Sequence, residues 1–527
     1  MRVLIFHGYL LRGTGSNVYN ANLAQALARL GHDVHLLCQD LQAAALPWVD
    51  AVGRWEEGEL AVERTGHVTP AESESESERG STTAYLPDIG GVLPTYVADS
   101  YDGFRALTFP ELTDEEIETY IAANVAAIAD VVARTRGVEA ALANHLVMGP
   151  AILARSGLPF AAKVHGSALS YTVMPHPRFL PYAREGVDAA EAILVGSRHT
   201  AEALWRTLGD PGLRDKTRLG PPGVDVEAFS PLPARSAART ELEGLADELD
   251  PASEGAAIAG DGFGRDGAGA AAALRSYAEA EGPRVIFVGK LIVSKGCDLL
   301  LAAWPLVVRE HPGARLLIIG FGSYREALGR LWAALVGGDF DEAREIAAQG
   351  RALESGGETG TLAYLDAFLT RLPDGYAEAA RAAEGSIDLA GRLEYGEVAH
   401  AVRASDAMVV PSTFPEAFGM VAAEAAATGA LPVCARHSGL AEVAERLSEA
   451  LGEELGWLTS FEPGPEAVAE IADRLNGWLA LGPADREAAG SSLAAAVRAR
   501  WSWEGVATAV LAASAGELID LDPVPSG

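Results

Sequence analysis

Basic residues are scarce in this sequence relative to acidic ones. Lys and Arg total 41 and Asp and Glu total 73, which gives a formal net charge of −32 at pH 7. Such a charge excludes a protein that binds nucleic acid or anionic lipid over its whole surface, because both ligands need positive charge. A local basic pocket for phosphate groups is still compatible with it. No nucleic acid is therefore expected as a partner.

Cysteines and long apolar runs are also few. Cys38, Cys297 and Cys434 are scattered and form no CxxC pair, which argues against a disulfide framework and a zinc knuckle. No stretch of about 18 apolar residues occurs, and the apolar start at residues 1–11 is too short for a signal peptide or membrane helix. We therefore expect no integral membrane segment and a cytoplasmic location.

Aromatic residues make up only 7% of the chain, whereas hydrophobic residues make up 49%. Length predicts two to three domains. Short apolar runs alternate with amphipathic segments such as Val18–Leu30, a pattern typical of βαβ units around a parallel sheet. The strands expected in the first half are Val3–Phe6, Asp33–Leu37, Ala140–Asn144, Phe160–Val164 and Ala192–Val195. Those expected in the second half are Arg284–Val288, Arg315–Ile319, Ile387–Ala390, Ala407–Val410, Leu431–Ala435 and Gly456–Leu458. The prediction is an α/β protein of two doubly wound halves.

Three stretches interrupt this alternation. Residues 66–83 contain an acidic Glu-Ser repeat and are interpreted as an exposed loop. Residues 236–281 are rich in Ala, Gly and acids and are interpreted as a linker or surface excursion. Residues 329–384 have helical spacing without a strand, which predicts a helical insertion in the second domain. A closing helix is expected after Trp501.

A glycine-containing turn follows the first predicted strand. Gly13 and Gly15 lead directly into the first predicted helix, whose N-terminus offers free N–H groups and the positive end of its dipole. The turn is a poor dinucleotide fingerprint, because Val18 stands where a third glycine would be needed. A structural turn and a phosphate- or sugar-binding loop are both compatible with it.

Two lysines flank a strand-to-helix turn in the second half. Lys290 and Lys295 can converge on one diphosphate, and fixed cations stabilise the charge that forms when a nucleoside diphosphate leaves. Two solvated surface lysines are the alternative. Their position at a strand end in a chain this acidic favours the diphosphate site.

Two glutamates lie in the segment after the strand expected at Ala407–Val410. A loop carries Glu416, and a helix of small residues carries Glu424. Eight residues of helical rise is about 12 Å, so the pair is not expected to share a proton and should contact different parts of one extended ligand. The alternative is one capping and one exposed acid. An unpaired carboxylate would be costly among the alanines around Glu424.

These motifs together resemble the family-4 retaining glycosyltransferases, the glycosyl transferases group 1. The resemblance rests on Glu-x-Phe-Gly-x-x-x-x-Glu from Glu416 to Glu424, on the two lysines, on the Gly-rich turn and on Pro221–Asp225. It runs from residue 3 to about 505 and is interrupted by the three stretches above. It implies a GT-B fold, in which two Rossmann-like doubly wound domains face a central cleft.

The resemblance also implies roles for individual residues. Glu416 would contact the hydroxyls of the donor sugar and Glu424 the ribose, while Lys290 and Lys295 would bind the diphosphate. His165, at the end of a predicted strand, matches a histidine that contacts the transferred sugar. The implied catalytic set is Glu416, Lys290, Lys295 and His165. The implied donor-binding set is Gly13, Gly15, Leu393, Phe418, Gly419 and Glu424. The first lysine is commonly arginine, so Lys290 gives a point charge instead of a bidentate fork.

The implied domains are residues 1–225 for the acceptor, together with a C-terminal helix at about 501–520, and residues 283–500 for the nucleotide-sugar. Residues 226–282 would link them. The implied reaction is retaining transfer of a hexose from a UDP- or GDP-sugar to the hydroxyl of a sugar, polyol or other acceptor. No cofactor and no metal ion are expected. A phosphorylase-like enzyme and a non-catalytic nucleotide-sugar-binding protein are the alternatives. The sequence identifies neither the acceptor nor the sugar, and it leaves a homodimer open.

Overall fold

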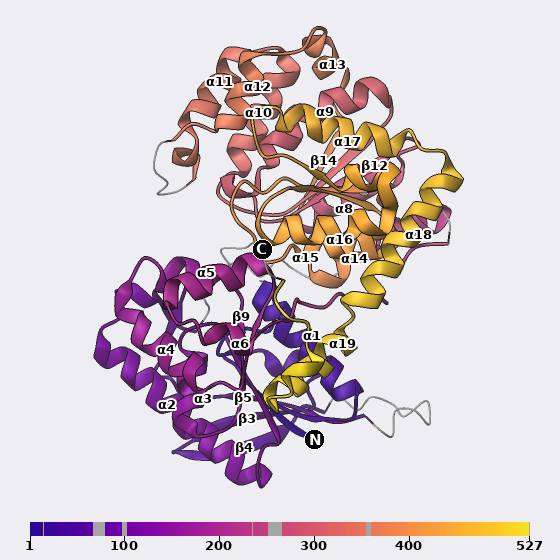
Figure 1. Cartoon of the computed structure of the whole chain (residues 1–527). Helices are drawn as coiled ribbons and strands as arrows, with labels where there is room; N and C mark the ends of the chain where they lie inside the picture. The colour runs from indigo at the N-terminus through magenta and orange to yellow at the C-terminus, as the bar shows by residue number, and fades with distance from the viewer. Residues whose placement is uncertain are drawn as a thin grey trace. The chain divides into compact units, whose positions relative to one another are not determined.

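The computed structural model describes residues 1–13, 15–66, 79–96, 103–233, 235–250, 266–354 and 360–525. The chain forms two compact units. The first unit comprises Met1–Gly223 and Trp501–Gly527, and the second comprises Val224–Arg500 (Figure 1). Most of the acidic repeat expected to form an exposed loop, residues 67–78, lies outside the described residues.

The first unit is built on a nine-stranded sheet with the order β11-β10-β9-β8-β1-β2-β5-β3-β4. All neighbours are parallel except β3 and β4, which form an antiparallel pair. Its strands are β1 Arg2–Phe6, β2 Asp33–Leu37, β3 Ala51–Glu56, β4 Glu59–Arg64, β5 Thr82–Leu86, β8 Ala140–Asn144, β9 Ala161–Val164, β10 Ala192–Val195 and β11 Thr217–Leu219. A separate pair joins β6 Val92–Thr95 to β7 Arg105–Thr108. The five strands predicted in this half are confirmed as β1, β2, β8, β9 and β10.

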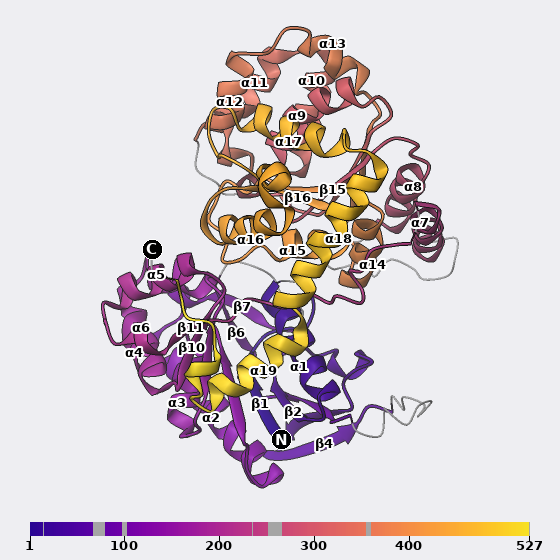
Figure 2. The ribbon, with the colours of Figure 1, turned by 45° about the vertical axis from the view of Figure 1, so that its right-hand side comes forward.

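Helices cover both faces of this sheet. Alternate residues of β1 enter two hydrophobic clusters: Leu4 lies with α2 and α3, whereas Val3 and Ile5 lie with α1 and α19. The C-terminal helix α19 therefore belongs to the first unit, where it lies beside α1 (Figure 2). The helices are α1 Gly15–Arg29, α2 Asp114–Thr135, α3 Gly149–Ser156, α4 Leu180–Ala189, α5 Arg198–Leu208, α6 Leu213–Lys216 and α19 Trp503–Ser514.

The second unit contains a six-stranded parallel sheet with the order β14-β13-β12-β15-β16-β17. Counted along the chain this order is 3-2-1-4-5-6, that of a Rossmann fold, and the order reverses between β12 and β15. Its strands are β12 Arg284–Val288, β13 Arg315–Ile319, β14 Ile387–Gly391, β15 Ala407–Val410, β16 Leu431–Ala435 and β17 Ser460–Phe461. The strand predicted at Gly456–Leu458 is wrong: Gly456–Thr459 is a 3-10 helix, and the strand begins just after it.

The residues between β13 and β14 form helices, so the segment expected as a helical insertion is helical where it is described. Leu331, Leu335, Ile346 and Leu369 of this segment are buried. Its helices are α10 Arg325–Gly337, α11 Phe340–Gln349, α12 Ala363–Thr370 and α13 Tyr376–Ala382. The remaining helices of the sheet layers are α9 Cys297–Glu310, α14 Tyr395–Arg403, α15 Met420–Ala427, α16 Ser438–Leu455, α17 Ala467–Leu479 and α18 Pro483–Arg500.

The stretch expected to be a linker contains two helices of the second unit, α7 Arg235–Leu249 and α8 Gly267–Ala278, which pack against each other. The linker interpretation is therefore wrong for these residues. It followed composition, but Leu242, Leu245 and Ala246 have the spacing of a buried helical face and are buried.

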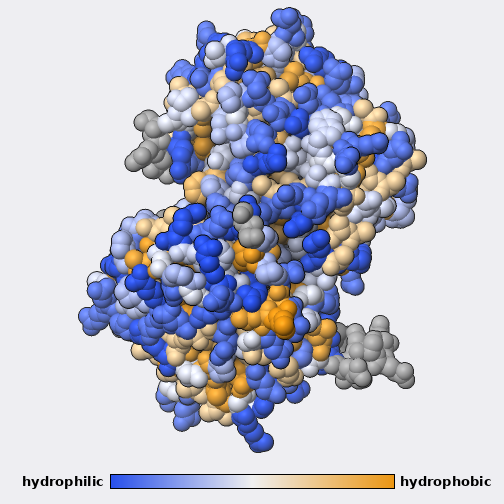
Figure 3. All heavy atoms as spheres, viewed as in Figure 1, coloured by the Kyte–Doolittle hydropathy of each residue, from blue (hydrophilic) through white to orange (hydrophobic). Residues whose placement is uncertain are grey.

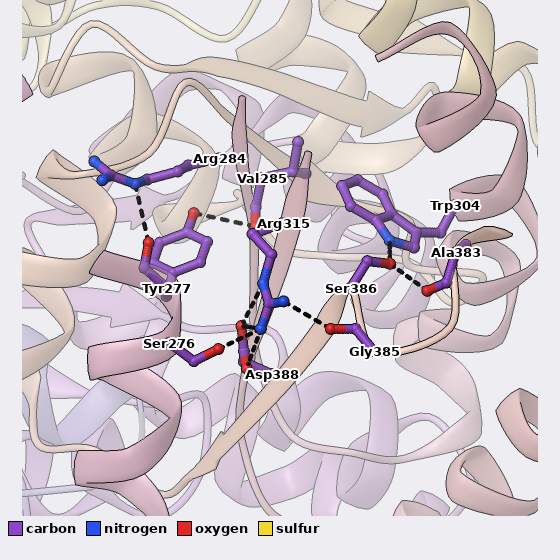
Figure 4. Close-up of polar contacts among 10 residues, drawn as sticks. All are labelled: Ser276, Tyr277, Arg284, Val285, Trp304, Arg315, Ala383, Gly385, Ser386 and Asp388. Atoms are coloured by element: carbon purple, nitrogen blue, oxygen red, sulfur yellow. Dashed lines mark hydrogen bonds and ion pairs between the residues drawn. The ribbon is translucent and has the colours of Figure 1, made fainter. Parts of the chain in front are cut away.

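Polar contacts also attach α8 to the sheet. The guanidinium group of Arg315, at the start of β13, donates to Asp388 of β14 at 2.7 Å and to Ser276 of α8 (Figure 4). The hydroxyl of Tyr277 donates to the carbonyl oxygen of Val285 at 3.2 Å. These contacts lie at the amino ends of the strands, so α8 supports the sheet at the end opposite to the loops described below.

Hydrophilic residues cover most of the face shown in Figure 3, with hydrophobic residues in smaller separate patches. Within the described part of the chain, no helix combines the length and the apolar character needed to cross a bilayer.

Candidate active site

The loop after β12 carries both predicted lysines. Leu291 N donates to the carbonyl oxygen of Phe321 at 2.7 Å, and Val293 N donates to Glu354 Oε1 at 2.6 Å. A 3-10 turn at Val293–Lys295 then leads into α9. The Glu354 carboxylate, which follows α11 within the helical insertion, thus holds the turn that presents Lys295.

This loop lies directly against the loop that follows β15. Gly296 has a φ of +65°, and a Cβ added to it would lie 2.0 Å from the carbonyl oxygen of Pro411. Glycine is therefore required here for both conformation and space. Thr413 N donates to the carbonyl oxygen of Ser294 at 2.9 Å. The two loops meet because β12 and β15 are neighbours in the sheet.

The approach of these loops brings Lys295 and Glu416 together. Lys295 Nζ forms an ion pair with Glu416 Oε1. Ser412 Oγ donates to the same carboxylate oxygen at 2.7 Å. The side chain of Glu416 is 24% exposed and that of Lys295 33% exposed, so both keep some access to solvent. A cation, a carboxylate and a hydroxyl thus form one cluster at the point where the strand order reverses.

Two residues that were not predicted from the sequence fix the loop that carries Ser412 and Glu416. Ser438 Oγ accepts a hydrogen bond from Glu416 N at 2.8 Å, and His437 Nε2 lies 2.6 Å from the carbonyl oxygen of Ser412. That carbonyl can only accept, so Nε2 carries a proton, and Nδ1 lies 3.0 Å from Ser438 Oγ. Both residues follow strand β16. Polar residues at the end of a strand next to β15 were the available signal.

Two opposing effects set the charge of Glu416. Burial alone would raise the pKa of its carboxyl group, but Lys295, the Ser412 hydroxyl and His437 together leave that pKa below its usual value. Glu416 is therefore ionised at neutral pH and faces a fixed positive charge.

Glu424 lies in a different environment within α15. That helix begins after Gly419, and the Glu424 side chain is buried among alanines. Burial, supported by the negative charge of Asp225, raises the pKa of Glu424 to about 7, although Tyr395 opposes the shift. An added ligand hydroxyl would favour the ionised form, because hydrogen bonds to a carboxylate stabilise its charge.

Glu424→Gln is expected to raise the melting temperature at about pH 8 and to change it little at about pH 5. The folded-state pKa lies above the unfolded value, so the native wild type holds an extra proton between the two and loses stability as pH rises. Glutamine has no proton to lose. Thermal denaturation at both pH values measures the effect, with Glu449→Gln on the exposed face of α16 as the control. If wild type and Glu424→Gln differ in melting temperature by the same amount at both pH values, the raised pKa of Glu424 is contradicted.

Three further residues predicted for the donor or catalytic site lie in the second unit. Lys290 is exposed at the start of its loop. Leu393 and Phe418 are buried, Leu393 between β14 and α14 and Phe418 just before α15. The donor roles of these three residues stay predictions.

His165, Gly13 and Gly15 belong to the first unit. Gly13 lies in the turn after β1 and Gly15 begins α1. His165 follows β9, and its ring lies edge-on to Tyr19 of α1 with ring centres 4.9 Å apart. Burial lowers the pKa of His165 well below its usual value, and His145, Lys163 and His7 lower it further. The imidazole is therefore neutral at physiological pH.

Residues 377–487, which include Glu416 and Glu424, match the family Glycosyl transferases group 1. The chain is 28% identical over 352 residues to D-inositol 3-phosphate glycosyltransferase from Xylanimonas cellulosilytica, a match that covers 66% of this chain and 63% of that protein. It is 26% identical over 185 residues to a GDP-mannose-dependent alpha-(1-6)-phosphatidylinositol monomannoside mannosyltransferase from Mycolicibacterium smegmatis, covering 35% and 38%. The chain thus spans less than two thirds of these relatives' length.

Solved structures resemble this chain over nearly its whole length. Sucrose-phosphate synthase from Thermosynechococcus elongatus matches with a TM-score of 0.53 and 16% identity, covering 98% of both chains. The catalytic domain of starch synthase IV from Arabidopsis thaliana, bound to ADP and acarbose, matches with a TM-score of 0.54 and 12% identity, also over 98% of both. At these low sequence identities, the structural match shows the fold alone.

The two parallel sheets and their resemblance to these structures define a GT-B fold. Residues 377–487 thus match the glycosyl transferases group 1 family, the family that the sequence motifs resemble.

Proposed function

We propose that this protein is a retaining glycosyltransferase that moves a hexose from a UDP- or GDP-sugar to a hydroxyl acceptor. The observation that carries the proposal is the contact of Lys295, Ser412 and Glu416 at the carboxyl ends of β12 and β15. Ligands of open α/β sheets bind where the strand order reverses, and that is where these side chains meet.

In this proposal Lys295 stabilises the departing nucleoside diphosphate. It immediately precedes Gly296 and the N-terminus of α9, a helix of 14 residues that presents the positive end of its dipole there. A side-chain cation and a helix end aimed at one region stabilise developing phosphate charge. Lys290, more exposed, would add a screened charge.

Glu416 and Glu424 have different parts in this proposal. Glu416 is ionised and half-buried, so it can accept hydrogen bonds from sugar hydroxyls. Its negative charge can also stabilise the positive charge that develops at the anomeric carbon. Glu424, buried within α15, would accept hydrogen bonds from the ribose hydroxyls of the donor. One carboxylate then acts on the reacting sugar and the other on the nucleotide.

Retention follows if the acceptor hydroxyl attacks the face that the diphosphate leaves. The C–O bond to the leaving phosphate breaks as the new glycosidic bond forms, and the acceptor's proton passes to a phosphate oxygen. Lys295 compensates the charge on that phosphate. The second unit would bind the donor, and the first unit, with His165, would bind the transferred sugar and the acceptor.

The names of two relatives suggest an acceptor class to test. One acts on D-inositol 3-phosphate and another on a phosphatidylinositol monomannoside. Both names contain inositol, so we propose a cyclic polyol or a glycoside of one as the acceptor.

A thermal-shift screen against UDP-, GDP- and ADP-sugars tests the donor part of the proposal. A donor at 100 times its dissociation constant should add about 2.7 kcal/mol to the free energy of unfolding. The matched control is Lys295→Met, which should shift less at the same donor concentration. If no nucleotide-sugar or nucleoside diphosphate stabilises the wild type, the proposal fails.

Transfer is expected to survive EDTA. In the proposed site Lys295 and the α9 N-terminus would supply the positive charge that a divalent cation could otherwise supply, and the described residues include no group of three potential His, Cys, Asp or Glu ligands. The measurement is the rate of nucleoside diphosphate release before and after chelation. Loss of activity that added Mn²⁺ restores would contradict the expectation.

A further inference from the structure

Hydrogen bonds connect His165 to the Gly-rich turn through the interior of the first unit. His165 Nε2 lies 2.8 Å from Asn144 Oδ1, and Asn144 Nδ2 lies 2.7 Å from Asn20 Oδ1. Asn20 Nδ2 lies 3.0 Å from His7 Nδ1, and His7 Nε2 lies 3.0 Å from Asn17 Oδ1. The chain of contacts therefore runs from the end of β9, past β8 and β1, to the first turns of α1.

Backbone carbonyl groups fix the direction of each bond, because a carbonyl oxygen only accepts. The amide of Asn144 donates to the carbonyl oxygen of Phe6 at 3.2 Å, so the atom that faces Phe6 is Nδ2 and the atom that faces His165 is Oδ1. An amide oxygen at that position accepts a hydrogen bond. The ring of His165 must therefore carry its proton on Nε2.

The other members of the chain are fixed in the same way. Asn20 Nδ2 donates to the carbonyl oxygen of Ser16 at 2.8 Å, so His7 Nδ1 accepts. His7 Nε2 donates to the carbonyl oxygen of Leu10 at 2.9 Å, and Asn17 Nδ2 to that of Arg12 at 2.7 Å. Each donor meets an acceptor along the whole chain, and no member needs a second proton.

The surroundings keep both rings neutral. Burial lowers the pKa of His7 to about 4 and that of His165 well below its usual value. The titratable groups near the His165 ring are Tyr19 of α1, His145 after β8, Lys163 of β9 and His7 after β1. None of these groups is a carboxylate, whose negative charge would stabilise an imidazolium. In the single neutral tautomer that remains, Nδ1 of His165 holds a lone pair.

We propose that Asn144, supported by Asn20, is a positioning residue that fixes His165 in the Nε2–H tautomer, so that Nδ1 accepts a hydrogen bond from a sugar hydroxyl. The substrate part of this inference rests on the function proposed above. The tautomer part does not, because it follows from the hydrogen bonds alone.

The tautomer is measured in the wild-type protein by NMR with ¹⁵N-labelled histidine, since protonated and lone-pair ring nitrogens have well-separated shifts. The signal of His165 is identified by its loss in His165→Asn. We expect a proton on Nε2 at about pH 7. A proton on Nδ1, or a doubly protonated ring, would overturn the inference even if the protein never transfers a sugar.

Asn144→Leu tests whether Asn144 is what fixes the tautomer of His165. It removes the acceptor for Nε2–H, so His165 should become a mixture of tautomers and kcat/KM should fall about 10–100-fold, as for other residues that orient a functional histidine. The matched control is Asn124→Leu, which removes a buried amide of α2 that donates to Tyr120 O, outside the chain of bonds. It should leave the His165 spectrum unchanged.

A double-mutant cycle separates this role from a loss of packing. The amide of His165→Asn has an acceptor near the Nδ1 position and no tautomer, so Asn144→Leu should cost little further activity in that background. The same 10–100-fold loss in both backgrounds would assign Asn144 a structural role only. If wild-type protein shows the expected tautomer but no transfer, the proposed function fails and the tautomer assignment stands.

Discussion

Glu416→Gln is expected to lower kcat by about 10²–10³ while the protein still folds and binds its donor. The wild-type side chain is ionised at neutral pH, since Lys295, Ser412 and His437 outweigh the effect of burial on its pKa. Glutamine keeps the shape and an oxygen that can accept from Ser412, but it removes the negative charge. That charge interacts more strongly with the transition state, where the anomeric carbon becomes positive, than with the bound donor.

Steady-state kinetics with saturating donor measure this effect, and thermal shift with the nucleoside diphosphate checks binding. Glu449→Gln is the control, because Glu449 forms an exposed ion pair with Arg446 on α16. Near-normal turnover of Glu416→Gln would remove Glu416 from the catalytic residues. Because the wild-type pKa is lowered, turnover should also show no loss from protonation of Glu416 until the pH falls below about 4.5.

Lys295→Met should have an effect at least as large, about 10²–10³ in kcat or more. Two causes combine. The leaving diphosphate loses its fixed cation, and Glu416 loses the ion-pair partner that holds its pKa down. Burial then acts on Glu416 unopposed by Lys295, so its pKa rises and residual activity should increase with pH in the range where wild-type activity is constant.

Lys295→Arg and Lys290→Met are the comparisons for this prediction. Arginine keeps the charge and should restore part of the activity. Lys290 is exposed, so its charge is screened, and its loss should cost only about 10-fold, or about 1.4 kcal/mol. Combining Lys295→Met with Glu416→Gln should cost less than the sum of the two single changes, since both disrupt one pair. Strict additivity would show that the two residues act independently.

The meeting of Lys295 and Glu416 was predictable in outline from the sequence. Both follow predicted strands of one doubly wound half, and the Rossmann order makes those two strands neighbours, so their loops meet at one end of the sheet. The contacts behind Glu416 were not predictable in the same way. Ser438 bonds to the backbone of Glu416 and His437 to that of Ser412, and hydrophobic periodicity gives no signal for such side-chain contacts.

In the first half of the chain, two strands were not predicted from the sequence. Strands β3 and β4 form a hairpin around Glu57 and Gly58, whose φ values are +52° and +86°. Positive φ at both central residues is typical of a type I′ turn, for which Asn-Gly or Asp-Gly is the usual sequence signal. Glu-Gly is weaker evidence. The burial of β4 is also only partial, so its hydrophobic alternation is poor.

The linker interpretation failed because composition was weighed above periodicity. The segments at α7 and α8 are rich in Ala and Gly, yet Leu274 and Tyr277 are fully buried and Arg275 forms ion pairs with Asp247 and Asp250 across the two helices. Small residues allow close helix packing as readily as they allow flexibility. Alanine-rich composition therefore predicts a linker only where helical spacing of larger apolar residues is missing.

The anomeric configuration of the product tests the central claim most directly. The protein is incubated with an α-linked UDP- or GDP-hexose that stabilises it and with a panel of polyols and sugars, inositol phosphates included. Nucleoside diphosphate release and proton NMR of the product are then recorded. The account predicts release that depends on the acceptor and an α-glycoside as product. A β-glycoside, or no transfer to any hydroxyl acceptor by a protein that binds the donor, would contradict it.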